Sequence, residues 1–327
     1  RSSILYTKTP TITTRLLSSL SPMNFDIDPI TGKFYVEHST CIRPAGTLKE
    51  ESDIRARDIY NANPGKIMLC LSAGLDSQMA LVSFLRQGIP IECSFLRLGG
   101  FNDNEYQNLK VLESKWGFKA HIITIDPNQR REEIEHLKGV LGVHGNHCIQ
   151  HMFVKELPGD YDVVQVLHDP WIMTHAKSGL HYLYQSYYDP EIARFRALSA
   201  VARPGRIVMF GDSSEYLLSS INDELFHNFL HSWVYYKKNG FQLSSNVPVP
   251  DILRYEYYIK PMLYAKHWKD ELVYFPKFSG YENVDWLTKE VRSLRREREC
   301  YIPYHNLITH LQSGAGAHRF YQAPDTV

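Results

Sequence analysis

One hexapeptide of the chain combines small and polar residues at a spacing that suits phosphate binding. Ser72-Ala73-Gly74-Leu75-Asp76-Ser77 stands between the apolar run KIMLCL, residues 66–71, and a second apolar segment, residues 78–86. A turn between a buried strand and a helix directs backbone N–H groups and the positive end of the helix dipole toward phosphate oxygens. The sequence therefore predicts an anion-binding turn at this place.

A second polar turn, residues 211–215, follows the apolar run RIVMF. Its acids, Asp212 and Glu215, are three residues apart. Such a pair suits a Mg²⁺–nucleotide site, because open α/β sheets bind ligands beyond the carboxyl ends of their strands. The same residues also suit a helix N-terminus, with Asp212 or Ser213 as the N-cap and Glu215 in the first turn. The sequence leaves both interpretations open.

The elements that must position these turns alternate between strands and helices. Strands are expected at 66–71, 91–98, 120–126, 161–167 and 206–211, and helices at 78–86, 103–115 and 190–202. Strands that are nearly continuous apolar runs, separated by helices, predict a parallel sheet covered on both faces. The expected fold is therefore α/β, a doubly wound parallel sheet.

The two ends of the chain differ from this pattern. Residues 25–37 contain two alternating runs around Pro29 and Gly32, which predicts a β-hairpin. Beyond Asp223 the sequence is rich in aromatic residues and helical in pattern. We therefore expect an N-terminal arm over 1–62, an α/β domain over 63–222 and a mostly helical region over 223–327.

Ser72–Ser77 resembles the SGGxDS signature of the PP-loop ATP pyrophosphatases, whose nucleotide-binding sheet is Rossmann-like. The resemblance implies that Ser72, Gly74 and Ser77, with the backbone of Ala73 and Leu75, hold the phosphates of ATP, and that Asp76 holds Mg²⁺ and takes part in catalysis. Ala73 departs from the signature, which has Gly there. If the turn needs a positive φ at that residue, alanine costs roughly 1 kcal/mol.

Two further segments resemble the asparagine synthetase-like branch of this superfamily, and a late segment with three lysines resembles an element of several PP-loop families. Residues 94–126 are similar to its second strand, acidic loop and helix, which implies that the backbone around Phe95 and Leu96 contacts adenine. Residues 211–215 are similar to its GxGxDE turn, which implies a nucleotide contact at Gly211, a catalytic Asp212 and a metal-binding Glu215. Lys260 is the leading choice among three late lysines to neutralise pyrophosphate. This likeness also favours 206–211 over 161–167 as the fourth strand.

The resemblance implies an enzyme that needs ATP and Mg²⁺ and forms AMP and pyrophosphate. A substrate oxygen is activated by adenylation and then attacked by an amine or ammonia, and no glutaminase domain is recognised in this chain. One alternative is a sulfur transferase that acts on a nucleobase through Cys148 or Cys300. Another is a nucleotide-binding regulator without catalytic activity.

Composition limits the partners. The 36 basic and 36 acidic residues balance, which argues against nucleic acid and favours ATP and a small-molecule substrate. Five scattered cysteines form neither a disulfide framework nor a metal motif, which indicates a cytoplasmic setting. No apolar run is long enough for a membrane span. The first 25 residues weakly resemble a transit peptide, but we favour an ordinary arm. A homo-oligomer is compatible with the sequence but not specified by it.

Overall fold

The computed structural model describes most of the α/β region and parts of both ends. Residues 40–62, 64–141, 143–166, 205–221, 223, 260–276 and 279–287 are described, together with segments 23–27, 34–38, 170–174, 181–185, 302–303, 312–313 and 318–321. The predicted helix at 190–202 lies outside these residues. None of the helices within them has the length and apolar character needed to cross a bilayer.

The centre of the molecule is a five-stranded sheet with the order β5-β4-β3-β6-β9. Its strands are β3 (Ile67–Cys70), β4 (Glu92–Arg97), β5 (Ala120–Thr124), β6 (Asp162–Gln165) and β9 (Ile207–Met209). Every neighbouring pair is parallel. The predicted parallel sheet is therefore confirmed.

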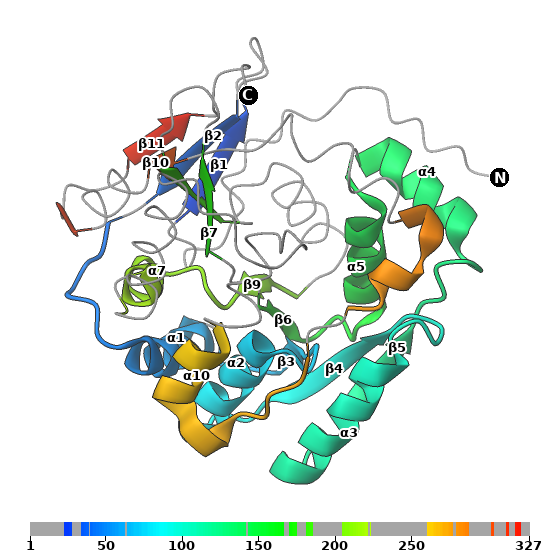
Figure 1. The fold of residues 1–327 in the computed structure, drawn as a ribbon, viewed down its shortest axis with the longest axis horizontal. Coiled ribbons are helices and arrows are strands. Elements are labelled where there is room, and N and C mark those ends of the chain that lie inside the picture. The colour runs from blue at the N-terminus through cyan, green and yellow to red at the C-terminus, as the bar shows by residue number, and fades with distance from the viewer. Residues whose placement is uncertain are drawn as a thin grey trace, which may run out of the picture.

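Helices connect these strands and flank the sheet (Figure 1). They are α1 (Leu48–Ala62), α2 (Leu75–Arg86), α3 (Asp103–Trp116), α4 (Arg131–Leu141), α5 (Gly145–Glu156), α7 (Ser214–Ile221) and α10 (Lys260–Trp268). Two short 3₁₀ segments follow α10, namely η3 (Lys269–Glu271) and η4 (Tyr281–Asn283).

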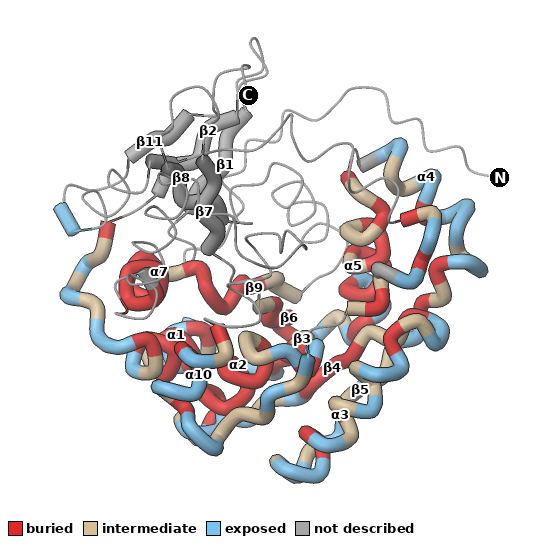
Figure 2. Tube along the Cα trace, viewed as in Figure 1, coloured by how far each residue is buried: buried red, intermediate tan, exposed pale blue. Residues whose placement is uncertain are grey.

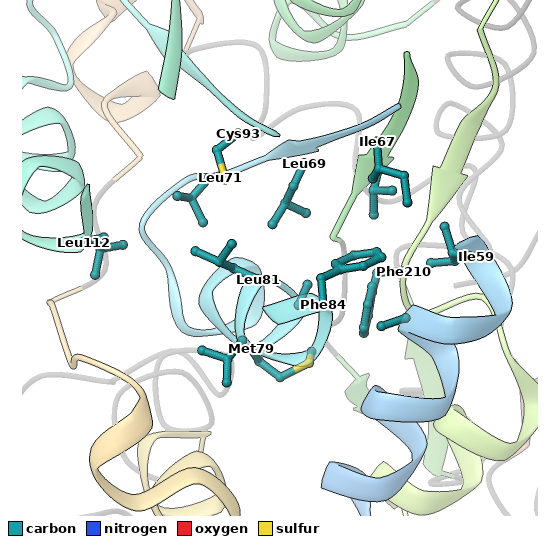
Figure 3. Packing of buried hydrophobic residues seen from close by; sticks show 14 of the residues in the cluster. Ile59, Ile67, Leu69, Leu71, Met79, Leu81, Phe84, Cys93, Leu112 and Phe210 are labelled. Carbon is teal, nitrogen blue, oxygen red and sulfur yellow. The ribbon is translucent and has the colours of Figure 1, made fainter. Parts of the chain in front are cut away.

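Both faces of the sheet are covered by apolar side chains from helices. On one face Ile67 and Leu69 pack with buried residues of α1, α2, α3 and α10, including Met79 and Phe84 (Figure 3). On the other face Met68 and Val163 pack with residues of α4 and α5. The buried segments run through the middle of the layers (Figure 2). Because apolar side chains leave both sides of each strand, the doubly wound α/β prediction is confirmed.

The preference for 206–211 as the fourth strand is wrong. The fourth strand in chain order is β6, which pairs with β3, whereas β9 pairs with the far side of β6 as a fifth strand. All four residues of β6 are buried, as expected for an inner strand, whereas β9 begins with a half-buried Ile207. Both segments are nevertheless strands of the same sheet.

The ends of the chain add short antiparallel sheets. The predicted hairpin is confirmed by the pairing of β1 (Met23–Ile27) with β2 (Phe34–His38), and β11 (His318–Tyr321) pairs with the other side of β2. A third sheet has the order β10-β8-β7, with β7 (Pro170–Thr174), β8 (His181–Gln185) and β10 (Ile302–Pro303). The described part of the C-terminal region thus contains strands as well as the predicted helices.

The sequence analysis missed α1, which lies within the range assigned to the N-terminal arm. Its Ala56 and Ile59 are fully buried in the same cluster as α2. Its Arg55 is also buried and donates hydrogen bonds to the carbonyl oxygens of Phe210 (2.9 Å) and Met209 (3.0 Å). This helix therefore fastens the segment after β9 to the sheet.

Candidate active site

The predicted anion-binding turn joins the carboxyl end of the central strand β3 to the N-terminus of α2. Ala73 has φ 58°, and Gly74 is the N-cap residue with φ −69° and ψ 158°. The chain thus enters the left-handed region at Ala73, the position where the signature has Gly, and alanine carries the strain foreseen from the sequence. The first backbone N–H groups of a helix have no carbonyl partner within the helix, so those of α2 can bind an anion at this turn.

Two buried side chains of α2 hold this turn. The Gln78 amide donates to the carbonyl oxygens of Ala73 (2.7 Å) and Val273 (2.8 Å), and its Oε1 accepts from the Val273 N–H at 2.8 Å. The Ser77 hydroxyl donates to the Gly74 carbonyl at 2.9 Å and accepts from the Ser72 N–H at 3.2 Å. Ser77 therefore shapes the turn from inside.

A cavity of about 310 Å³ opens at the carboxyl edge of the sheet, beside this turn. Ser72, Ala73, Gly74, Leu75 and Asp76 line it, as do Phe95 and Leu96 at the end of β4, and Lys260. Its volume lies at the lower end of the range of small-molecule sites. Of the residues predicted for the site, eight thus meet at one cavity.

Asp76, the charged residue of the turn, forms an ion pair with Lys260. Lys260 Nζ lies 2.5 Å from Asp76 Oδ2, and the hydroxyl of Tyr264 donates to Asp76 Oδ1. The side chain of Lys260 is 6% exposed and that of Asp76 is 17% exposed. Lys266 instead pairs with Asp223 at 3.1 Å, so Lys260 is the one of these two lysines that reaches the cavity. The sequence analysis missed Tyr264, which α10 brings next to Lys260 through its one-turn spacing.

The β4 side of the cavity is mainly apolar. Phe95 and Leu98 are buried and line it together with Leu96. The side chain of Asn102, also missed in the sequence, donates to the Leu96 carbonyl at 2.8 Å and accepts from the Leu98 N–H at 2.7 Å. This arrangement fixes the loop after β4 and leaves an apolar surface that suits a flat ring.

The second polar turn, residues 211–215, does not reach the cavity. Gly211, Asp212 and Glu215 are absent from the cavity lining, as is Ser77. Glu215 Oε1 accepts a hydrogen bond from the Ile42 N–H at 2.7 Å, and the Ser213 hydroxyl accepts from the Tyr216 N–H at 3.3 Å. Ser213 therefore caps α7, which is the helix-capping interpretation of this turn.

Cys148, His147 and His151 lie within α5. Cys148 is fully buried in the apolar cluster on that face and does not line the cavity, and Cys300 is outside the described residues. Burial, followed by repulsion from Lys155, lowers the pKa of His151. Within the described ranges, no three His, Cys, Asp or Glu side chains gather closely enough to hold a metal ion.

Comparisons with known proteins give similarities among solved structures only. No protein-family model and no curated protein sequence matches the chain. NMN synthetase from Francisella tularensis is 12% identical, with a TM-score of 0.31, and the match covers 71% of this chain and 100% of that one. Glutamine-dependent NAD⁺ synthetase from Acinetobacter baumannii is 14% identical, with a TM-score of 0.32, and the match covers 83% of this chain and 49% of that one.

A third solved structure is NH₃-dependent NAD synthetase from Campylobacter jejuni. It is 12% identical, with a TM-score of 0.28, and the match covers 82% of this chain and 93% of that one.

Proposed function

We propose that the chain is a Mg²⁺-dependent adenylating enzyme that converts ATP to AMP and pyrophosphate. The observation that supports this is the turn Ser72–Asp76, which lines a cavity at the carboxyl edge of a parallel sheet with the buried Lys260 beside it. Backbone N–H groups at the start of a helix bind phosphate oxygens, and a buried ammonium stabilises the negative charge that develops on a leaving pyrophosphate.

The lining residues that the sequence predicted have separate roles in this proposal. The backbone of Ser72 to Leu75 and the Ser72 hydroxyl bind the phosphates, and the apolar surface of Phe95 and Leu96 faces the base. Lys260 neutralises the pyrophosphate. An oxygen of the acceptor forms a bond to the α-phosphorus while the bond from that phosphorus to pyrophosphate breaks, and an amine or ammonia then displaces AMP. Gly211, Asp212 and Glu215 receive no role here, because they do not line the cavity.

The residues present fit a magnesium ion that is bound mainly by its nucleotide. Mg²⁺ in such sites takes one or two carboxylates, with phosphate oxygens and water completing the octahedron. Asp76, whose oxygens accept from Lys260 and Tyr264 in this structure, would supply a carboxylate at the helix N-terminus, where negative charge is favoured. The bound ion would neutralise charge on the phosphates.

Product analysis tests this proposal. The protein is incubated with ATP, Mg²⁺ and a panel of amino acids, nucleotides and ammonia, and the products are separated by ion-exchange chromatography. We expect AMP and pyrophosphate, and their loss in Asp76→Asn. The control is Asp160→Asn, at a surface carboxylate that is 59% exposed and pairs with Lys66. Formation of ADP and phosphate would contradict the proposed attack on the α-phosphorus.

The alternatives have distinct outcomes in the same assay. A sulfur transferase that uses Cys148 would lose turnover in Cys148→Ala, but this thiol is buried away from the cavity. A regulator without catalytic activity would bind ATP and release no pyrophosphate with any acceptor. Neither has an observation in the described residues that favours it over adenylation.

A further inference from the structure

Gln165, the last residue of β6, has a buried side-chain oxygen that accepts no hydrogen bond from the part of the chain that the structure describes. The residue is 8% exposed and lines the cavity. Its backbone carbonyl accepts from the Phe210 N–H at 2.8 Å, which continues the sheet. Its side-chain Oε1, in contrast, has no donor among the residues that the structure describes. A buried acceptor in this state is costly, and such groups are uncommon in folded proteins.

The register of the sheet places this residue on the side of α5. Met68 and Val163 are partners across β3 and β6, and both belong to the apolar cluster with α5. Two positions further along each strand, Cys70 and Gln165 return to the same face. Phe153 and Gln150 of α5 also line the cavity. Gln165 thus forms part of a subsite bounded by a ring, a thiol and a second primary amide.

The charges around the cavity argue for an uncharged ligand group in this subsite. The charged residues of its described lining are Asp76, Glu105 and Lys260, and the proposed function assigns Lys260 to the leaving pyrophosphate. A carboxylate that enters a buried site needs an Arg or Lys partner to offset the loss of its hydration. A primary amide such as Gln165 offers an acceptor and a donor side by side, which is the complement of another amide.

We propose that Gln165 is a specificity-determining residue whose Oε1 accepts a hydrogen bond from the N–H of an uncharged amide on the acceptor substrate. This inference rests on the proposed function for the identity of the cavity as a substrate site. Gln165 selects an acceptor that carries an amide over one that carries a carboxylate, because the lining described around it supplies a neutral amide and no arginine.

The first test needs no ligand. Gln165→Leu replaces the unpaired amide with an apolar side chain of similar size, so we expect a higher melting temperature than that of the unchanged protein. Gln165→Met serves as a second variant with a more adaptable side chain. Gln107→Leu, at an exposed position of α3, is the matched control and should leave the melting temperature unchanged. A lower melting temperature in both Gln165 variants would overturn the inference.

The second test compares benzamide with benzoate as probes, by calorimetry with and without a non-hydrolysable ATP analogue and Mg²⁺. We expect the protein to bind benzamide about tenfold more tightly than benzoate, and Gln165→Leu to lose this preference while it still binds the analogue. Equal binding of the two probes, no binding of benzamide, or a preference that persists in Gln165→Leu would contradict the role of Gln165. Failure to bind the ATP analogue, with the benzamide preference intact, would instead contradict the proposed function.

Discussion

Lys260 and Asp76 form a nearly buried ion pair although 184 positions separate them in the chain. Lys260 is the first residue of α10, and Asp76 lies in the first turn of α2. Both side chains line the cavity, and Tyr264, one turn along α10, donates to the other oxygen of the same carboxylate. The pair thus links α10 to the turn that we propose binds phosphate.

Removal of the lysine should destabilise the fold more than removal of the carboxylate charge. Lys260→Met leaves Asp76 as a poorly solvated carboxylate, so we expect the free energy of unfolding to fall by about 3 kcal/mol. Asp76→Asn keeps one oxygen that can accept from Lys260, and its amide nitrogen can donate to the Tyr264 hydroxyl oxygen, so this variant should cost less. Urea unfolding of both variants and of the double variant measures the coupling. Losses that simply add in the double variant would show that the two side chains do not interact.

Gln78 should hold the turn and the segment after η3 together. Gln78→Leu removes three hydrogen bonds and leaves the Val273 N–H and two carbonyl groups without this partner, so we expect a loss of about 2–3 kcal/mol in the free energy of unfolding. Trypsin should also cleave faster after Lys269, which is exposed nearby. Gln107→Leu on the surface of α3 is the control. Unchanged stability and cleavage would show that the segment is held by other contacts.

Gly280 should tolerate a side chain less well than Gly117, although both have positive φ. A Cβ at Gly280 (φ 79°) would lie 2.5 Å from the Cβ of Asn102 and 2.9 Å from the Phe101 carbonyl oxygen, whereas one at Gly117 (φ 70°) would have no atom within 4 Å. We therefore expect Gly117→Ala to cost about 1 kcal/mol through its backbone alone.

Gly280→Ala should cost at least twice as much, because it must also displace the loop that holds Asn102 beside the cavity. Thermal unfolding of the two alanine variants compares them directly. Equal costs would mean that the chain around Gly280 adjusts without loss.

The repeating strands and helices were predictable because their signal is local. Runs such as residues 66–71 are apolar at successive positions, which is what a strand covered on both faces requires. Helix α1 was missed because its buried face carries charges. Glu51 is 1% exposed and accepts two hydrogen bonds from Arg43, at 2.7 and 2.6 Å, and Arg55 is buried against β9 and the residue after it. A hydrophobic pattern cannot reveal such a helix.

The site was predictable only where its residues are adjacent in the sequence. The turn Ser72–Asp76 is one contiguous motif, and its lining of the cavity follows from the strand before it and the helix after it. The roles of Gln78 and Tyr264 depend on which distant segment packs against α2, which no local pattern specifies. Gln165 reaches the cavity because β6 lies next to β3. The sequence analysis had preferred 206–211 over 161–167, the segment that contains β6, for this position.

Glu113 should make part of the stability depend on acid pH. Its side chain is 3% exposed, and burial alone would raise the pKa of this carboxyl. Hydrogen bonds from the Ala120 N–H and Lys110, both at 2.9 Å, outweigh burial and hold the pKa below its usual value. A carboxyl with a lower pKa in the folded state binds protons more weakly than in the unfolded state. Its stabilising contribution is therefore complete above about pH 4.5 and is lost as the pH falls through the folded-state pKa.

The comparison of Glu113→Gln with the unchanged protein measures this contribution. We expect the variant to be less stable by about 2 kcal/mol near pH 7, since a buried, charge-assisted network is lost, and the difference to shrink toward about pH 3. Urea unfolding across this range gives both values. The control is Glu135→Gln, at a carboxylate that is 42% exposed and pairs with Lys138, and it should change stability by less than about 1 kcal/mol at neutral pH. A difference for Glu113→Gln that stays constant between pH 7 and pH 3 would assign its effect to packing, because only an ionised carboxylate contributes the pH-dependent part.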